Sequence, residues 1–208
     1  MELMQKVSHS RSFRLRGIVG AFLLLPAGGA VLFSTPNVRA GSLLDWGCHA
    51  CGWLLLAVYA TFRMWATLYV GGRKDRILQT EGVYSATRNP LYVGSACLAL
   101  AAVLFFESAL LLLLTGVLVA FYFRTVIRSE EDVLRHRFGA AFDDYTRATP
   151  RFIPSFSRYR RTTEVTVNFD ALRREAHRLW GAAALPIVAE LVALLRNNEH
   201  WPHWFQLV

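Results

Sequence analysis

Four stretches of the chain are almost free of charged residues, and polar segments separate them. The stretches cover residues 17–33, 43–62, 91–106 and 109–127. Even the first, at 17 residues, would rise about 25 Å as a helix, close to the bilayer hydrocarbon thickness of about 30 Å. Only Glu107 and Ser108 join the last two stretches, so these form a helical hairpin. The pattern predicts an all-α fold, a polytopic membrane helical bundle with four spans.

The pattern changes after the fourth stretch, where acidic residues precede a further apolar face. Gly139 is expected to end this helix, since glycine readily adopts the backbone conformation that follows a helix. Residues 140–147 are expected to form a short helix, and the prolines of 149–154 favour an extended segment. We interpret residues 128–156 as a C-terminal cap outside the membrane.

Residues 157–208 form a C-terminal extension. Within it, residues 168–197 have helical periodicity and a broad apolar face. The most apolar part, 182–195, has only 14 residues and contains Glu190, which makes it short for a membrane crossing. We therefore favour an interfacial or docking helix, with a fifth span as the alternative.

Composition supports the membrane interpretation. Hydrophobic residues make up 54% of the 208-residue chain and charged residues 18%, yet the net charge is +8. The basic residues cluster in an N-terminal arm, residues 1–16, and in the polar segment 71–90. By the positive-inside rule, the N-terminus, this segment and everything after Arg128 lie in the cytoplasm. The basic excess is thus a sign of topology and of contact with membrane lipids, and we expect no nucleic-acid partner.

Two features near the N-terminus have competing interpretations. The basic start, the apolar stretch and the sequence Val38-Arg39-Ala40 also resemble a cleavable signal peptide, although Arg39 is a poor residue at a cleavage site. Cys48 and Cys51 have the spacing of a redox or metal pair, but they lie in an apolar stretch with no second ligand pair nearby. We interpret the cysteines as small apolar residues on a membrane helix, and we expect no metal site.

The predicted hairpin brings two polar segments to the same side of the membrane. One precedes the third span and contains Arg88, Asn89 and Tyr92; the other follows the fourth span and contains Glu130 and Glu131. These five side chains can therefore line one pocket at the cytoplasmic membrane edge. The pocket suits a ligand with a carboxylate, an ammonium group and hydroxyls, because arginine binds carboxylates through a planar fork.

Two further readings concern the same segments. Gly94 would allow a close backbone approach to a ligand. Alternatively, Arg88, Arg124 and Arg128 pair with the two glutamates only to anchor helix ends.

An ordered set of motifs resembles one family, the isoprenylcysteine carboxyl methyltransferases and phospholipid methyltransferases of membranes. The resemblance covers about residues 45–156, roughly half of the chain. It rests on Leu78-x-Thr80-x-Gly82-x-Tyr84, Arg88-Asn89-Pro90-x-Tyr92-x-Gly94, Glu130-Glu131-x-x-Leu134, Phe138-Gly139, Tyr145 and Pro150-Arg151-Phe152-Ile153-Pro154.

The resemblance implies S-adenosylmethionine as the methyl donor. The residues that it implies for cofactor binding are Tyr84, Arg88, Asn89, Pro90, Tyr92, Gly94, Glu130, Glu131, His136 and Tyr145. It implies catalytic roles for Arg88, Glu131 and Arg151. Two positions depart from the family: Asn89 stands where many members have histidine, and Phe142 replaces a tyrosine.

The resemblance leaves the methyl acceptor open. A prenylated cysteine carboxylate, an amine-headed phospholipid, or a smaller lipophilic acid or thiol would each fit an active edge at the membrane. Two other functions compete: a non-enzymatic membrane scaffold, and a nicotinamide-dependent reductase related to the sterol reductases. The reductases have an Arg-Asp pair where this chain has Glu130-Glu131, which favours the methyltransferase. The oligomeric state stays open.

Overall fold

The computed structural model describes residues 26–36, 38–71, 77–157 and 159–204, and these residues contain helices and no strand. The helices are α2 (Leu43–Val70), α3 (Val83–Ala86), α4 (Pro90–Phe106), α5 (Ala109–Phe138), α6 (Ala140–Ala148), α7 (Phe169–Ala183) and α8 (Leu185–Arg196). The predicted all-α membrane bundle is thereby confirmed.

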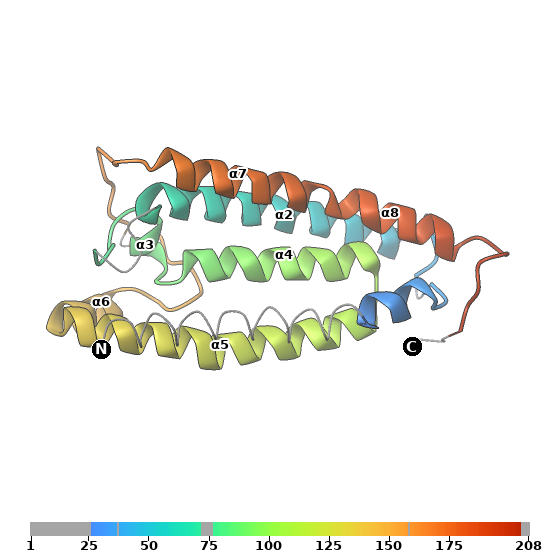
Figure 1. The fold of residues 1–208 in the computed structure, drawn as a ribbon, viewed down its shortest axis with the longest axis horizontal. Helices are drawn as coiled ribbons and strands as arrows, with labels where there is room; N and C mark the ends of the chain where they lie inside the picture. Colours follow the sequence, from blue (N-terminus) through green and yellow to red (C-terminus); the bar gives the residue numbers. More distant parts are fainter. Residues whose placement is uncertain (1–25, 37, 72–76, 158, 205–208) are drawn as a thin grey trace.

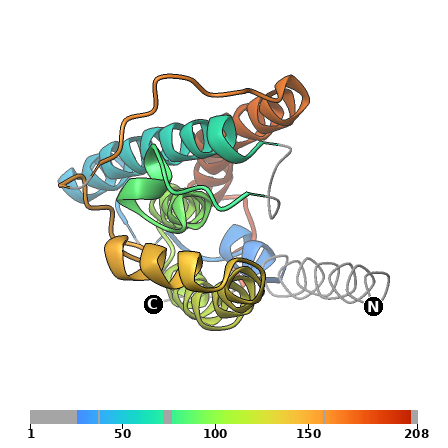
Figure 2. The same ribbon diagram turned by 90° about the vertical axis from the view of Figure 1, so that its left-hand side faces the viewer.

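The long helices lie side by side along the longest axis of the molecule (Figure 1). Helix α4 lies between α5 on one side and α2 with α7–α8 on the other. Helices α3 and α6 gather at one end of the bundle, which we call the cap end (Figures 1 and 2). The α4–α5 turn and residues 26–32 lie at the opposite end, which we call the far end (Figure 1).

Local sequence signals fix the helix ends. Ser42 caps α2 by accepting a hydrogen bond from Asp45 N, and Ser108 caps α5 by accepting one from Leu111 N. Gly139 ends α5 with a φ of +53°, as its sequence position predicts.

The predicted fourth span and the acidic helix after it form one continuous helix, α5, of 30 residues. A helix of that length rises about 45 Å and so extends well beyond a hydrocarbon layer of about 30 Å. The cap is therefore a direct extension of a membrane helix.

Among the described residues, three helical segments are long and apolar enough to cross a membrane: α2, α5 and the α7–α8 segment Phe169–Arg196. Helix α4 is apolar but shorter, at 17 residues. Large apolar side chains such as Leu54, Leu113 and Leu194 are about two-thirds exposed on the outer faces of their helices. This surface suits contact with lipid tails, which solvate apolar side chains.

The core between α2, α4 and α8 consists of Leu56, Tyr59, Ala101, Phe105 and Ala189. Helix α2 has no side chain where the ring of Phe105 meets it at Gly52; a Cβ atom there would lie 2.9 Å from that ring. Small residues at helix contacts are typical of membrane bundles, because they let the helices approach closely.

The C-terminal extension was expected to contain an interfacial or docking helix, with a fifth span as the alternative, and it packs on the bundle. Helices α7 and α8 form a nearly continuous rod that runs back along α2 and packs on α4 (Figure 1). The polar half of the rod is accommodated because Glu175 is buried against Arg63 of α2, at 2.5 and 2.8 Å. This arrangement favours the fifth crossing.

The rod brings the last described residues to the far end, away from the cap. There Trp204 N donates to Phe33 O at 2.8 Å. On which side of the membrane the residues after Arg128 lie stays a prediction.

The N-terminal predictions are only partly within the described residues. The arm, residues 1–16, and most of the predicted span 17–33 lie outside them. Residues 26–32 are helical, with Ala27 and Val31 buried. The cytoplasmic orientation of the N-terminus and of the cap stays a prediction.

Candidate functional site

Residues 149–157 and 159–160 follow α6, and we call them the strap. The strap holds the segment that contains α3. Backbone hydrogen bonds of 2.9 Å join the two: Arg88 N donates to Pro150 O, and Ser155 N donates to Ala86 O. The strap is not helical from Pro150 onwards, as its prolines predict. These bonds place the residues before α4 against those after α6.

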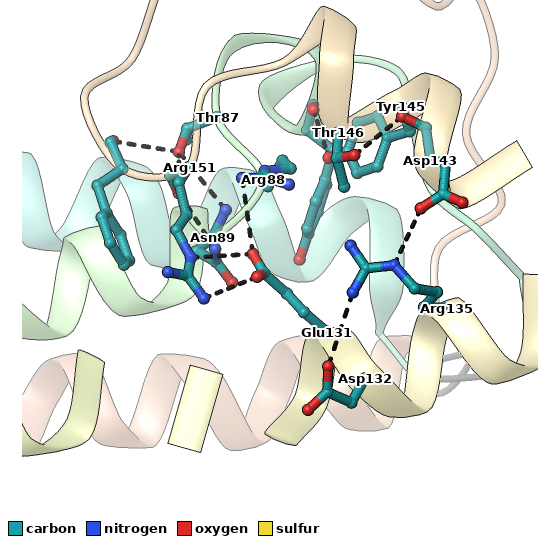
Figure 3. A network of polar contacts seen from close by, with 12 residues as sticks. Thr87, Arg88, Asn89, Glu131, Asp132, Arg135, Asp143, Tyr145, Thr146 and Arg151 are labelled. Atoms are coloured by element: carbon teal, nitrogen blue, oxygen red, sulfur yellow. Dashed lines mark hydrogen bonds and ion pairs between the residues drawn. The ribbon is translucent and has the colours of Figure 1, made fainter. Parts of the chain in front are cut away.

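Two polar side chains at the start of α4 anchor the strap (Figure 3). Asn89 Nδ2 donates to Arg151 O at 3.1 Å, and Thr87 Oγ1 lies 3.1 Å from Phe152 O. Thr87 is fully buried. The amide of Asn89 therefore has a definite donor role here, which needs no titrating group.

Arg151, Glu131 and Arg88 form an ion-pair chain beside this anchor (Figure 3). The guanidinium of Arg151 meets Glu131 in a two-bond fork, with Nε–Oε1 at 3.1 Å and Nη2–Oε2 at 2.7 Å. Arg88 Nη2 lies 3.8 Å from Glu131 Oε1. Such paired bonds between charged groups fix orientation as well as adding energy. Glu131 thereby links the strap, α5 and the start of α4.

The hydroxyl of Tyr145 on α6 donates to Tyr84 O on α3 at 2.7 Å, and this bond is buried. Burial raises the pKa of both tyrosine hydroxyls above the ordinary value. Both therefore stay protonated at physiological pH. Phe142 on the same helix is 1% exposed, so the position where the family pattern has tyrosine is part of the core here.

A cavity of about 660 Å³, its open mouth included, lies at the cap end between these elements. Seven predicted site residues line it: Tyr84, Arg88, Asn89, Pro90, Tyr92, Glu130 and Tyr145.

The other residues that line the cavity are mostly apolar, and they were not among the site residues predicted from the sequence. It consists of Val70, Ile77, Leu78, Gln79, Leu91 and Leu134. Leu78 and Leu134 belong to the motifs that resemble the family, so those motifs could have indicated that both residues lie at the site. Val70 and Ile77 carried no comparable signal, because apolar residues at a membrane edge are common.

Four predicted site residues lie elsewhere among the described residues. Glu131 and Arg151 lie behind Arg88 in the ion-pair chain. Gly94 faces α2, where a Cβ atom would lie 3.1 Å from Arg63 Cγ; its smallness serves helix packing. His136 is exposed, with its ring nitrogen 3.1 Å from Asp132 O of its own helix.

Arg88 carries the clearest sign of a ligand. Its Nε atom is buried and has no hydrogen-bond partner among the described residues. Buried donors are nearly always paired in folded proteins, so this atom points to a partner that the chain does not supply. A carboxylate suits a guanidinium best, and the cavity has acidic and apolar surface for the rest of such a ligand.

The family model for phospholipid methyltransferase matches residues 47–141. The chain is 34% identical to the nickel-cobalt-cadmium resistance protein NccN of Alcaligenes xylosoxydans xylosoxydans over 152 residues, 73% of this chain and 70% of NccN. It is 34% identical to the cobalt-zinc-cadmium resistance protein CzcN of Cupriavidus metallidurans over 147 residues, 70% of this chain and 67% of CzcN.

A shorter match is to the protein-S-isoprenylcysteine O-methyltransferase of Schizosaccharomyces pombe. It has 32% identity over 81 residues, 39% of this chain and 34% of that enzyme. No solved structure gives a significant match.

Proposed function

Because this chain belongs to the phospholipid methyltransferase family, we propose that it transfers a methyl group from S-adenosylmethionine to a lipophilic acceptor at the membrane edge. The observation that carries the proposal is Arg88, which lines the cavity and whose buried Nε has no hydrogen-bond partner among the described residues. S-Adenosylmethionine supplies an electrophilic methyl group on a sulfonium. Every other requirement, which is mainly proximity and orientation, falls to the protein.

The residues of the cavity suit the parts of this cofactor. Arg88 would hold its carboxylate, and the carboxylate of Glu130 suits an ammonium or hydroxyl group. The apolar side chains of Ile77, Leu78 and Leu134 offer surface for an aromatic base. Glu131 and Arg151 act as positioning residues, because their fork fixes the carboxylate beside Arg88.

The acceptor reaches the site from the bilayer in this proposal. The cavity lies at the cap end, where α2 ends and α4 begins, and its apolar lining includes Val70 and Leu91. An acceptor that is already a carboxylate or thiolate needs no strong base. A lipid amine would have to lose a proton before it attacks. Carboxylate and thiol acceptors therefore fit this site better than a charged amine.

The proposal is tested by binding of labelled S-adenosylmethionine to the full-length protein in detergent or nanodiscs. We expect saturable binding that Arg88→Ala abolishes and Arg88→Lys weakens, since lysine keeps the charge but loses the fork. The matched control is Arg173→Ala, at an exposed arginine of α7 that pairs only with Asp170. Absence of binding by the unaltered protein, or equal binding by Arg88→Ala, would refute the proposal.

The acceptor class is tested by incubating the protein with labelled methyl donor and fractionated membrane lipids and prenyl-cysteine compounds. Label that enters a base-labile ester identifies a carboxylate acceptor, and label that enters a stable thioether identifies a thiol. Label in an amine headgroup would contradict the preference for anionic acceptors.

The names of two relatives suggest a cellular setting. NccN and CzcN are named for resistance to nickel, cobalt, zinc and cadmium, and we propose that the methyl transfer serves cells exposed to such metals. Growth of cells that express the chain is compared with growth of cells that express Arg88→Ala, over rising cobalt or cadmium. Equal metal tolerance of cells with the unaltered chain and of cells with Arg88→Ala would show that the resistance does not depend on the methyl-transfer site.

A further inference from the structure

Four titratable side chains converge at the far end, remote from the cap. Asp45 and His49 lie one turn apart on α2, Glu107 lies in the α4–α5 turn, and Glu190 lies on α8. His49 Nδ1 is 3.1 Å from Asp45 Oδ1 and 3.9 Å from Glu107 Oε1. His49 Nε2 is 3.0 Å from Glu190 Oε1. Asp45 and Glu107 thus lie by one ring nitrogen of His49, and Glu190 lies by the other.

The spacing is that of metal ligands. One ligand atom each of Asp45, His49 and Glu107 lies within 4.8 Å of the other two. Metal bonds of about 2.0–2.2 Å in a tetrahedral site place neighbouring ligand atoms about 3.3–3.6 Å apart. The observed 3.1 and 3.9 Å bracket that range, so small side-chain shifts would complete the geometry.

Glu107 supplies an independent sign of a missing partner. Its Oε1 atom is buried and accepts no hydrogen bond among the described residues. Its backbone is left-handed, with a φ of +49°, as is common for a residue that ends a helix. A buried carboxylate oxygen without a donor is costly unless a cation or a donor satisfies it.

The charges around Glu107 also call for a cation. Asp45, Glu107 and Glu190 bring three negative charges, and the nearby guanidinium of Arg196 brings one positive charge. Arg196 donates to backbone carbonyls, among them Thr35 O at 2.7 Å. Two negative charges therefore remain when His49 is neutral and all three carboxylates are ionised.

Protonation of His49 is the simpler alternative, but it satisfies fewer groups. An imidazolium has two N–H donors, and these would reach Asp45 and Glu190 at 3.1 and 3.0 Å. Glu107 Oε1 would stay 3.9 Å away, beyond hydrogen-bond distance. A divalent cation accounts for the orphaned oxygen as well as for the net charge.

We propose that Asp45, His49 and Glu107 bind a divalent transition-metal cation. Imidazole nitrogen with carboxylate oxygens suits zinc, cobalt or nickel better than calcium or magnesium. A cavity of about 710 Å³, its open mouth included, is lined by all three side chains and gives the ion access. The site lies about 30 Å along α2 from the methyl-transfer pocket, so it is a second site and independent of the first.

The test is titration of the metal-free full-length protein in detergent with Zn²⁺, followed by calorimetry, and with Co²⁺, followed by its visible absorption. We expect one ion per chain and an absorption band of low-coordinate cobalt. His49→Gln keeps a hydrogen-bonding side chain but cannot replace imidazole, and we expect it to lower the affinity at least tenfold; Glu107→Gln should do the same. Loss of a supporting group alone costs about 10–100-fold in metal affinity.

Two controls make the ligand assignment specific. His177→Gln alters an exposed histidine of α7 and should leave binding unchanged. Cys48→Ser alters the thiol one turn from Asp45 and should also leave it unchanged. No stoichiometric uptake, equal uptake by His49→Gln, or loss of uptake in Cys48→Ser would each overturn the proposal. Binding of S-adenosylmethionine by the same samples reports folding and is independent of the metal result.

Discussion

Arg151 and Glu131 meet through two hydrogen bonds of 3.1 and 2.7 Å, although they lie 20 positions apart on different elements. The pair fastens the strap to α5 at the point where Arg88 approaches the same carboxylate. Both side chains are largely buried. The fork therefore determines where the guanidinium of Arg88 stands in the cavity.

Glu131→Gln and Arg151→Met should each lower the thermal stability, and the double variant should lose less than the sum of the two. Charge pairs in direct contact show coupling energies of about 0.5–3 kcal/mol. A double-mutant cycle on unfolding in detergent measures this coupling. The control is Arg135→Met, at a half-exposed pair with Asp143, where a change below about 1 kcal/mol is expected. Additive losses of stability in the two single variants would show that the Arg151–Glu131 ion pair contributes no coupling energy.

Gly82→Ala should disrupt the start of α3. Gly82 has a φ of +59°, and a Cβ atom there would lie 2.1 Å from Tyr69 Cζ. Backbone strain of this kind costs about 1–3 kcal/mol, and displacement of the tyrosine ring adds to it. The matched control is Gly181→Ala on α7, where nothing lies within 4 Å. Unfolding temperatures of the two variants test this; equal temperatures would contradict the close contact.

Glu175→Gln should destabilise the bundle more than the double change Arg63→Met with Glu175→Leu. Glu175 is 3% exposed and holds Arg63 through two bonds. Removal of one partner of a buried ion pair costs about 3–5 kcal/mol because it leaves the other charge unpaired. Arg178→Met removes only an exposed partner of Glu175 and serves as the control. Denaturation in detergent supplies the measurement.

High pH should destabilise the cap. Burial raises the pKa of Tyr84 and Tyr145 above the ordinary value of 10.0. A raised folded-state pKa means that the stability is fully present below about pH 10 and is lost as the pH rises beyond it. The ultraviolet absorbance of tyrosinate should show that the buried tyrosines Tyr59, Tyr84 and Tyr145, among the seven of the chain, titrate only as the protein unfolds. In Tyr145→Phe this late-titrating group should lose one member; early titration of all seven tyrosines in the unaltered protein would contradict the burial.

The two ends of the α7–α8 rod should face opposite sides of the membrane. Single cysteines at Asp170 and Glu199, both exposed, are introduced after Cys48, Cys51 and Cys97 have been replaced by serine. A thiol reagent that cannot cross the membrane should label one position from each side. Labelling of both from one side would restore the interfacial helix that the sequence alone favours.

The sequence predicts the elements of this bundle well because the relevant signals are local. Apolar runs predict α2, α4 and α5, and Gly139 predicts the end of α5. Topology predicts that the segments around Arg88 and Glu130 meet, since only two residues join α4 to α5. Accordingly, seven of the site residues predicted from the sequence line the cavity.

Contacts between distant helices could not be predicted in this way. Helix α4 is apolar on all its faces, so its pattern does not show which side meets α2. The structure turns Gly94 toward Arg63 and away from the cavity. It also brings Glu107 to His49. These pairings depend on how each helix is rotated and packed.

By itself, the sequence determined which segments are helices, where they end and which residues flank the hairpin, because propensity, capping and chain length act over a few residues. Only the tertiary structure decided that the strap joins Arg151 to Glu131, and that the C-terminal rod returns along α2 to the far end. Burying a charge requires a partner from elsewhere in the chain. The identity of that partner depends on the packing of the whole bundle, as Glu175 and Arg63 show.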